Sequence, residues 1–304
     1  SGMGTVEAGL TAGTARSVDA VEYIPEILEQ FNRVHGTGYV PRSVIDIDVA
    51  DVAAANPEVF HASPVCKNFT AAKRGVDNAN ELDRLSAEKV AEVIREVRPP
   101  IVTVENVPDY ADTALFKLIT DQLTASGYRW SADIVEAAEY GAAQERRRLI
   151  LRAVRDDIGE LPPAPEKTTG ADWYATVEDL IADAPDMPGA RKRMRSSLDA
   201  VRLRSPDAPD VPPILRNAPA WERRRLMAMA ERGTIDLNRP ILSMGGSTSR
   251  TNVSARNAGQ PGPTLKSSPK ETPRIYLPDG TAKRLTPRMM ARLTGLADSV
   301  PVPD

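Results

Sequence analysis

The chain has 304 residues, of which 41% are hydrophobic and 27% charged, as in an ordinary globular protein of one or two domains. No apolar run approaches the roughly 20 residues that cross a bilayer, and no signal peptide opens the sequence. The lone cysteine, Cys66, excludes an internal disulfide, and two histidines, His35 and His61, are too few for a typical zinc site. We therefore expect a cytoplasmic protein without a metal.

Charge is unevenly distributed along the chain. Residues 1–189 hold 18 Lys and Arg against 32 Asp and Glu, a net charge of −14, whereas residues 190–304 hold 21 against 10, a net charge of +11. A basic C-terminal part favours a polyanionic partner, most simply nucleic acid. A basic surface that docks onto the acidic half of the same chain would produce the same pattern, so charge alone leaves both interpretations open.

Strand and helix patterns alternate over residues 1–155. Apolar side chains recur at helical spacing in the helices, and β-branched apolar runs indicate the buried strands. The predicted elements are strands at 18–21, 101–104, 128–135 and 149–154, and helices at 25–34, 86–98 and 115–123, the last followed by Gly127 as a cap. Repeated units of this kind predict the α/β class, with an open parallel sheet and helices on both faces, as in a Rossmann-like domain.

The C-terminal half has a different composition. Residues 159–170 are linker-like, and the stretches 205–213 and 245–263 are so rich in Pro, Gly and Ser that they predict loops in a small irregular domain. Residues 284–296 predict a helix after Pro287, which we expect to pack back on the first domain.

Cys66 follows a run that is expected to end at the carboxyl edge of the sheet, where folds of this class place their sites. Lys67 and Lys73 supply positive potential that would favour its reactive thiolate form. A free cysteine is also commonly just a small buried hydrophobe. The surroundings favour the reactive interpretation without excluding the other.

Glu105 closes the apolar strand 101–104 and begins the sequence Glu-Asn-Val. An acid at the end of a buried strand is partly desolvated and could hold a proton near neutrality, or it could cap a helix. Gln144, Arg146 and Arg148 alternate with period two, which would place them on one face of a strand. Two guanidiniums there suit a planar oxygen-bearing ligand or a phosphate, although a solvated edge has the same pattern.

The N-terminus offers a weaker pattern for a cofactor. Gly2, Gly4 and Gly9 surround an expected helix start, where glycines let a ligand approach the backbone. Glu22 follows the strand expected at 18–21, so its carboxylate suits ribose hydroxyls, and Tyr23 could stack on an adenine ring.

In combination and in this order, four segments resemble the cytosine-C5 DNA methyltransferase family. They are SPVCKNF, ENV, QERRR and RLTPRMMARLTGL, and the resemblance covers nearly the whole chain. It implies a Rossmann-like S-adenosylmethionine-dependent methyltransferase domain with a smaller, irregular target-recognition domain. The implied divisions are a catalytic and cofactor-binding domain at 1–158, a linker and target-recognition domain at 159–270, and a segment at 271–304 that returns to the catalytic domain.

The resemblance also implies a covalent mechanism. Cys66 would add to C6 of a flipped-out cytosine in double-stranded DNA, and Glu105 would hydrogen-bond N3 and the exocyclic amine. Arg148 would contact O2, while Arg146 would steady the cysteine loop or a phosphate. S-adenosylmethionine would give its methyl group to C5 and leave as S-adenosylhomocysteine.

The remaining implied residues bind the cofactor or DNA, in a protein that we expect to be monomeric. For the cofactor they are Gly2, Met3, Gly4, Glu22, Tyr23, Asp48, Val49 and Pro64, with Asp46 as a rival to Asp48. For DNA they are Gln144, Arg216, Arg224, Arg250 and Arg256, with Arg223 and Arg225 as further candidates. Residues 221–232 would form a helix that presents a basic face to phosphates, and residues 244–257 would form either a loop that enters a groove or a disordered solvent loop.

The sequence departs from the family pattern at several places. Val65 precedes Cys66 where the family has proline, and Ala143 and Ala297 each stand for another proline. The chain starts inside the glycine motif and stops before the family's Gly-Asn-x-Val-Pro segment. Trimming of a longer protein, supply of the missing pieces by another chain, and their loss are three open explanations. A tRNA cytosine methyltransferase and an inactive DNA-binding relative remain alternative functions, and among DNA methyltransferases the role could be restriction–modification, phage self-protection or epigenetic marking.

Overall fold

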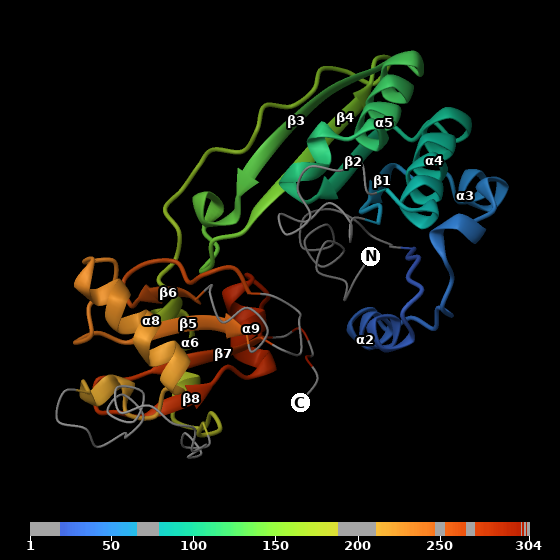
Figure 1. The fold of residues 1–304 in the computed structure, drawn as a ribbon. Helices are drawn as coiled ribbons and strands as arrows, with labels where there is room; N and C mark the ends of the chain where they lie inside the picture. Colours follow the sequence, from blue (N-terminus) through green and yellow to red (C-terminus); the bar gives the residue numbers. More distant parts are fainter. Residues whose placement is uncertain are drawn as a thin grey trace. The chain divides into compact units, whose positions relative to one another are not determined.

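The computed structural model describes residues 19–65, 79–187, 211–246, 253–265, 271–298, 300 and 302. They belong to two compact units (Figure 1). Unit 1 comprises residues 1–136 and 147–166, and unit 2 comprises residues 137–146 and 167–304.

Unit 1 combines a four-stranded sheet with helices. Its elements are α2 (Pro25–His35), η1 (Val44–Asp46), α3 (Val49–Ala55), β1 (Val59–Ala62), α4 (Glu81–Glu96), β2 (Ile101–Asn106), η3 (Pro108–Asp112), α5 (Ala114–Ala125), β3 (Tyr128–Glu136) and β4 (Arg147–Arg155). The strand order is β1-β2-β4-β3. This confirms the expected α/β class.

The sheet of unit 1 is mixed, whereas a parallel sheet was expected. β1 and β2 are parallel, but β4 runs antiparallel to both β2 and β3. Parallel neighbours need a long crossover that usually contains a helix. Only residues 137–146, with the 3-10 turn η4 (Ala137–Tyr140), join β3 to β4, so these strands pair as a hairpin.

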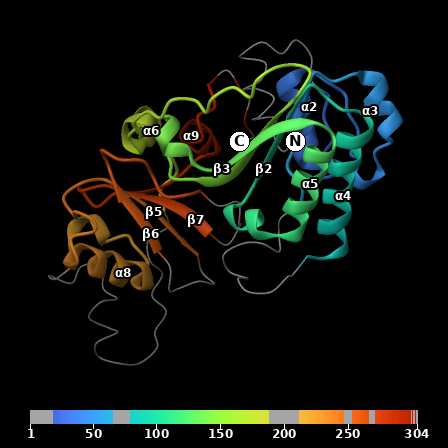
Figure 2. The ribbon, with the colours of Figure 1, turned by 90° about the horizontal axis from the view of Figure 1, so that it is seen from above.

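Helices α4 and α5 lie side by side against one face of this sheet (Figures 1 and 2). Their apolar residues pack on alternate residues of β2 and β4; the main contributors are Val90, Ile94, Phe116, Ile119, Val102, Val104, Leu149 and Leu151. The residues between them in β2 and β4 point to the opposite face. That opposite face carries the polar side chains His61, Thr103, Glu105 and Arg148.

Most predicted elements of unit 1 are confirmed, with two differences. α4 begins at Glu81, earlier than expected, because Asn80 and Asp83 form a capping box at its start. The prediction of a strand at 18–21 is wrong, since residues 19–24 adopt no regular structure. Ala20 instead packs in a small cluster with Leu28 and Phe31 of α2, so its apolar side chain is buried without strand pairing.

Unit 2 contains a four-stranded antiparallel sheet covered by helices on both faces. Beyond η4, its elements are α6 (Trp173–Ile181), η5 (Pro213–Leu215), α8 (Ala220–Glu231), β5 (Ile241–Gly246), β6 (Val253–Asn257), β7 (Glu271–Tyr276), β8 (Ala282–Arg284) and α9 (Pro287–Leu293). The strand order is β6-β5-β7-β8. Ile241 packs with α8, whereas the next residue, Leu242, packs with α6 and α9, as alternation along a strand requires.

Residues 253–257 form β6 where the composition indicated a loop. Ala255 and Asn257 are buried, and Val253 packs in the same cluster, so every second residue of this segment faces the core. The polar residues Ser254 and Arg256 alternate with them, and this strand pattern was missed because it is short and lies within a stretch rich in Gly, Ser and Asn.

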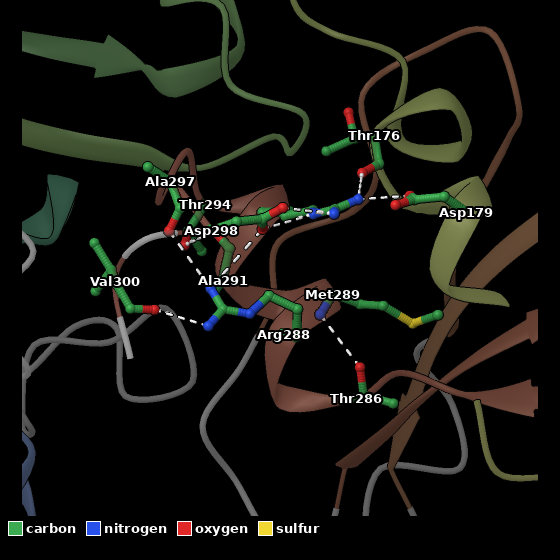
Figure 3. Close-up of polar contacts among 11 residues, drawn as sticks. Thr176, Asp179, Thr286, Arg288, Met289, Ala291, Thr294, Ala297, Asp298 and Val300 are labelled. Atoms are coloured by element: carbon green, nitrogen blue, oxygen red, sulfur yellow. Dashed lines mark hydrogen bonds and ion pairs between the residues drawn. The ribbon is translucent and has the colours of Figure 1, made fainter. Parts of the chain in front are cut away.

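The C-terminal helix α9 is fastened within unit 2 (Figure 3). Thr286 caps its start, and Arg292 donates to the carboxylates of Asp179 and Asp298 and to the carbonyl of Thr176 in α6. The divisions expected at 158 and 270 stay predictions. The return of residues 271–304 to the catalytic domain stays a prediction.

Among the described residues, no helix has the length and apolar character needed to cross a membrane. The same residues contain no group of three or more His, Cys, Asp or Glu placed to hold a metal ion.

Candidate active site

Polar side chains gather at one edge of the sheet in unit 1. β1 and β2 are parallel, so their carboxyl ends lie together, and β4 is antiparallel to β2, so its first residues lie at the same edge. Glu105 is paired with Ile150 in the antiparallel register, which makes Arg148 a diagonal neighbour on the same face. The strand pairing thus brings Glu105 and Arg148 together.

The carboxylate of Glu105 is held at both oxygens. Arg148 Nε lies 2.7 Å from Glu105 Oε1, and Ser63 Oγ donates to Oε2 at 3.0 Å. The side chains of Glu105 and Arg148 are 29% and 22% exposed, so a third group can still approach them. A charge-assisted pair in such a half-buried place fixes both orientation and charge.

A histidine continues this arrangement. His61 Nε2 lies 3.4 Å from Ser63 Oγ, and His61 Nδ1 lies 2.8 Å from Thr103 Oγ1. Burial lowers the pKa of His61, and the nearby Glu105 carboxylate opposes that effect. The motifs in the sequence did not point to His61, Ser63 or Thr103 as site residues. Their period-two spacing before the Cys66 segment and before Glu105 was the pattern that could have indicated them.

The segment that leads to Cys66 is anchored on two sides. Pro64 is buried, and its carbonyl accepts a hydrogen bond of 3.1 Å from Asn106 Nδ2 at the end of β2. The backbone N–H of Val65 donates to Ser86 Oγ of α4 at 3.2 Å. The Asn of the Glu-Asn-Val sequence therefore holds the approach to Cys66. Cys66 itself lies outside the described residues, as do Gly2, Met3, Gly4 and Arg250.

The described cofactor candidates have local backbone roles. Glu22 Oε1 accepts from the N–H groups of Tyr23 and Ile24 at 2.9 and 3.0 Å, just before α2, and the Tyr23 side chain is 47% exposed. Asp48 caps α3 by accepting from Ala50 N at 2.8 Å. Val49 is the first residue of that helix, and Asp46 is an exposed residue of η1.

Gln144, Arg146 and Arg148 do not share a strand, contrary to the expectation. β4 begins at Arg147, and Gln144 instead forms an isolated bridge with Gly262. Gln144 is 2% exposed, and its Oε1 accepts from the Leu265 N–H at 3.2 Å. Its burial argues against the expected DNA contact, because the amide serves the packing of unit 2. Arg146 is half-buried in unit 2.

The arginines of unit 2 have different surroundings. Arg223 is fully buried, and its guanidinium donates to the carbonyls of Arg216 and Ala218. The prediction that Arg223 contacts a phosphate is therefore wrong. The helix expected at 221–232 is confirmed as α8, but its basic face is reduced because Arg223 turns into the core. The exposed candidates are Arg216, Arg224 and Arg225.

Arg256 of β6 forms an ion pair with Glu145. Its Nε donates to Oε1 at 2.9 Å and its Nη2 to Oε2 at 2.6 Å, with side-chain exposures of 30% and 40%. The guanidinium is therefore already occupied by a carboxylate. A contact of Arg256 with a DNA phosphate would have to break or share this pair.

The arginine-rich helix α8 also contains a buried acid, Glu222. Glu222 accepts from Ser243 Oγ at 2.6 Å and from Arg274 Nη1 at 2.8 Å, and burial raises its pKa. These bonds attach α8 to β5 and β7. Because an isolated buried charge is costly, the pairing with Arg274 explains how Glu222 is tolerated in the core.

This chain belongs to the C-5 cytosine-specific DNA methylase family, whose model matches residues 1–302. It is 24% identical over 187 residues to the type II methylase M.HgiDII of Herpetosiphon aurantiacus, a match that covers 59% of this chain and 51% of the relative. It is 34% identical over 103 residues to the type II methyltransferase M.BspRI of Lysinibacillus sphaericus, with coverages of 32% and 24%. The chain thus spans about half, or less, of the length of these relatives.

Two solved structures share the fold over 99% of this chain. A DNA modification methyltransferase encoded within an E. coli prophage matches with a TM-score of 0.59 and 16% identity over 88% of its own length. The Dnmt2 methyltransferase of S. pombe matches with a TM-score of 0.55 and 15% identity over 86% of its length. At this level of identity, the likeness establishes the fold alone.

Proposed function

We propose that this protein is a DNA (cytosine-5-)-methyltransferase that transfers a methyl group from S-adenosylmethionine to C5 of a flipped-out cytosine in duplex DNA. The observation that carries the proposal is the Glu105–Arg148 pair, with its Nε–Oε1 distance of 2.7 Å, beside the anchored segment that leads to Cys66. The family description names both DNA and the C5 position of cytosine.

The proposed chemistry explains why these residue types occur together. C5 of cytosine is a weak nucleophile until a thiolate adds at C6, and Cys66 is the predicted source of that thiolate. The addition moves negative charge to N3, where a group that holds a proton must receive it. For this role Glu105 would take up a proton from solvent as the base binds, donate it in a hydrogen bond to N3 and accept from the exocyclic amine with its other oxygen, while Arg148 would supply fixed positive charge for O2.

The hydrogen bonds of Glu105 support this role. Arg148 and Ser63 occupy one carboxyl oxygen each, so the carboxyl group has a defined orientation before a base arrives. Pre-organised polar groups act most strongly in sites that exclude water, because no reorganisation is needed when charge develops.

The donor set in unit 1 fits S-adenosylmethionine, which supplies the methyl group when bound. Glu22 offers a carboxylate, a group that can accept from ribose hydroxyls, and the exposed ring of Tyr23 offers an aromatic face for adenine. Asp48 offers a second carboxylate. The rest of the proposed cofactor set is Gly2, Met3, Gly4, Val49 and Pro64.

The proposed substrate is duplex DNA. Because the reacting edge of cytosine is hidden in the base stack, the base must be flipped out at a cost of a few kcal/mol. Arg216 and Arg224 are exposed and are proposed to contact DNA. The net charge of +11 over residues 190–304 supports a phosphate-binding role for this part of the chain.

Covalent trapping tests the proposal. Duplexes of randomised sequence with 5-fluorocytosine in place of cytosine are incubated with the protein and S-adenosylmethionine, and the protein is analysed by mass spectrometry. Fluorine cannot leave as a cation, so the Cys66–C6 adduct should persist and add the mass of the DNA. Sequencing the trapped DNA would then identify the target site.

Two variants define the outcome. Cys66→Ser should abolish the adduct, and Glu105→Gln should slow its formation by about 100-fold or more, as expected when a charge-stabilising group is removed. A folded wild-type protein that binds DNA and S-adenosylmethionine but forms no adduct would overturn the proposal.

A further inference from the structure

Four side chains form a continuous hydrogen-bonded chain on the polar face of the unit 1 sheet. Thr103 contacts His61 at 2.8 Å, His61 contacts Ser63 at 3.4 Å, and Ser63 contacts Glu105 at 3.0 Å. His61 lies opposite Thr103 in the parallel register, and Ser63 and Glu105 follow each of them by two residues. Strand alternation therefore places all four on one face.

The direction of each hydrogen bond follows from the carboxylate. Ser63 has a single hydroxyl proton and gives it to Glu105 Oε2, so its oxygen can only accept from His61. His61 then carries its proton on Nε2, and its Nδ1 accepts from the Thr103 hydroxyl. Half-burial favours the neutral ring that this arrangement requires.

We propose that Ser63 is a positioning residue for Glu105 and that His61, held by Thr103, sets the direction of the Ser63 hydroxyl. This inference rests on the proposed function, in which Glu105 is the group that contacts cytosine. Arg148 and Ser63 together immobilise both carboxyl oxygens, which a single ion pair would not do. Removal of Ser63 should therefore misorient Glu105 without removing its charge.

The charged groups around His61 come from two neighbouring strands. Glu105 lies on β2, while Arg148 and Arg152 lie on β4, where Arg152 is paired with Thr103 in the register. Arg148 is neutralised by Glu105, and Arg152 is directed to the Pro162 carbonyl and to Asp133 at 3.6 Å. The Glu105 carboxylate raises the pKa of His61 electrostatically, whereas burial and the amino terminus lower it.

Histidine NMR tests the hydrogen-bonded chain without any need for activity. The sequence has two histidines, so a His35→Gln variant assigns both ring signals in the full-length protein. We expect His61 to titrate below its ordinary pKa because of burial. In Glu105→Gln, the pKa of His61 should fall further, because the carboxylate that favours the imidazolium has been removed. The inference would be overturned if the pKa of His61 were at its ordinary value and did not change in Glu105→Gln.

Methylation kinetics test the positioning role. Ser63→Ala should lower kcat about ten-fold, with the KM values for DNA and S-adenosylmethionine little changed, because one hydrogen bond to a catalytic carboxylate is lost. Ser63→Thr keeps the hydroxyl and should recover most of the rate. Ser131→Ala is the matched control, since Ser131 on β3 also donates to a carboxylate, that of the exposed Asp133, at 3.2 Å.

The two experiments separate the possible failures. Methylation by the wild type with equal rates for Ser63→Ala and Ser131→Ala would refute the positioning role and leave the proposed function intact. A wild type that shows the His61–Glu105 coupling but never methylates DNA would refute the proposed function, while the hydrogen-bonded chain would stand.

Discussion

Charge reversal of Glu145 and Arg256 would separate two roles for Arg256, as a DNA contact or as a residue that holds the 143–146 segment in place. The segment is attached to residues 262–265 by several bonds. Gly262 N donates to Ala143 O at 2.9 Å, and Glu145 N donates to Gly262 O at 2.7 Å. The two bonds from Arg256 to Glu145 add a side-chain contact to this backbone pairing.

The size of the effect follows from the geometry. Two charge-assisted hydrogen bonds would contribute about 1.5–3 kcal/mol if they were buried. The side chains are 30% and 40% exposed, so solvent screening reduces the coupling to about 1 kcal/mol. Glu145→Arg or Arg256→Glu alone should cost about 1–2 kcal/mol, since each also places like charges together. The double variant should recover about 1 kcal/mol of the summed loss.

Urea unfolding of the wild type, both single variants and the double variant measures this coupling. The same reversal at Lys167 and Glu139 is the control, because that pair is 65% and 44% exposed with one contact of 2.7 Å and should show almost no coupling. DNA affinity measured against salt gives the second readout. If Arg256 only holds the segment, the double variant should keep the salt dependence of the wild type.

A strictly additive result would refute this reasoning about Arg256. A double variant that regains stability but has a salt dependence of DNA binding reduced by about one phosphate contact would also refute it. That result would mean that Arg256 binds the DNA backbone directly.

Two further predictions concern buried groups. Arg223→Ala should destabilise unit 2 by about 2–3 kcal/mol, since the buried Ala218 carbonyl and the part-buried Arg216 carbonyl lose their donor. Arg224→Ala should change stability by less than about 0.5 kcal/mol but weaken DNA binding. Urea unfolding and a DNA titration compare the two variants, and equal stability losses would contradict the burial of Arg223. The pKa of His61 is lowered in the folded state, so below pH ~6.5 the unfolded chain binds a proton that the folded chain refuses, and stability should decrease as the pH falls from that value toward the folded pKa. His61→Gln should lose this component, and a pH dependence identical to that of the wild type would exclude His61 as its source.

Local sequence patterns predicted the elements that carry their own start and stop residues. The helix at 115–123 was predicted from its apolar spacing and from Gly127, whose φ of 73° suits glycine, and the structure adds Thr113 as the cap at the start of α5. The β-branched run 101–104 identified β2 equally well. These features depend on neighbouring residues in the chain, so they can be predicted without knowledge of the tertiary structure.

The order of the motifs was likewise sufficient to recognise the family, because it is a property of the sequence itself. Neighbouring residues with similar chemistry were not distinguished in this way. Arg223 and Arg224 are adjacent, yet one is fully buried and the other exposed. The orientation of α8 against β5 and β7 decides which arginine meets the core, and no local pattern encodes that orientation.

In the candidate site, too, the sequence predicted some residues and only the tertiary structure revealed others. The sequence by itself selected Glu105 and Arg148 through their resemblance to a motif, but its period-two spacing did not specify that Ser63 would contact the other carboxyl oxygen of Glu105. Ser63 and Glu105 are 42 residues apart, and so are His61 and Thr103. They meet because β1 pairs in parallel with β2 in one particular register, and a shift of one residue would turn these side chains to the opposite face. Only the tertiary structure sets that register, because it results from the burial of the apolar face beneath α4 and α5.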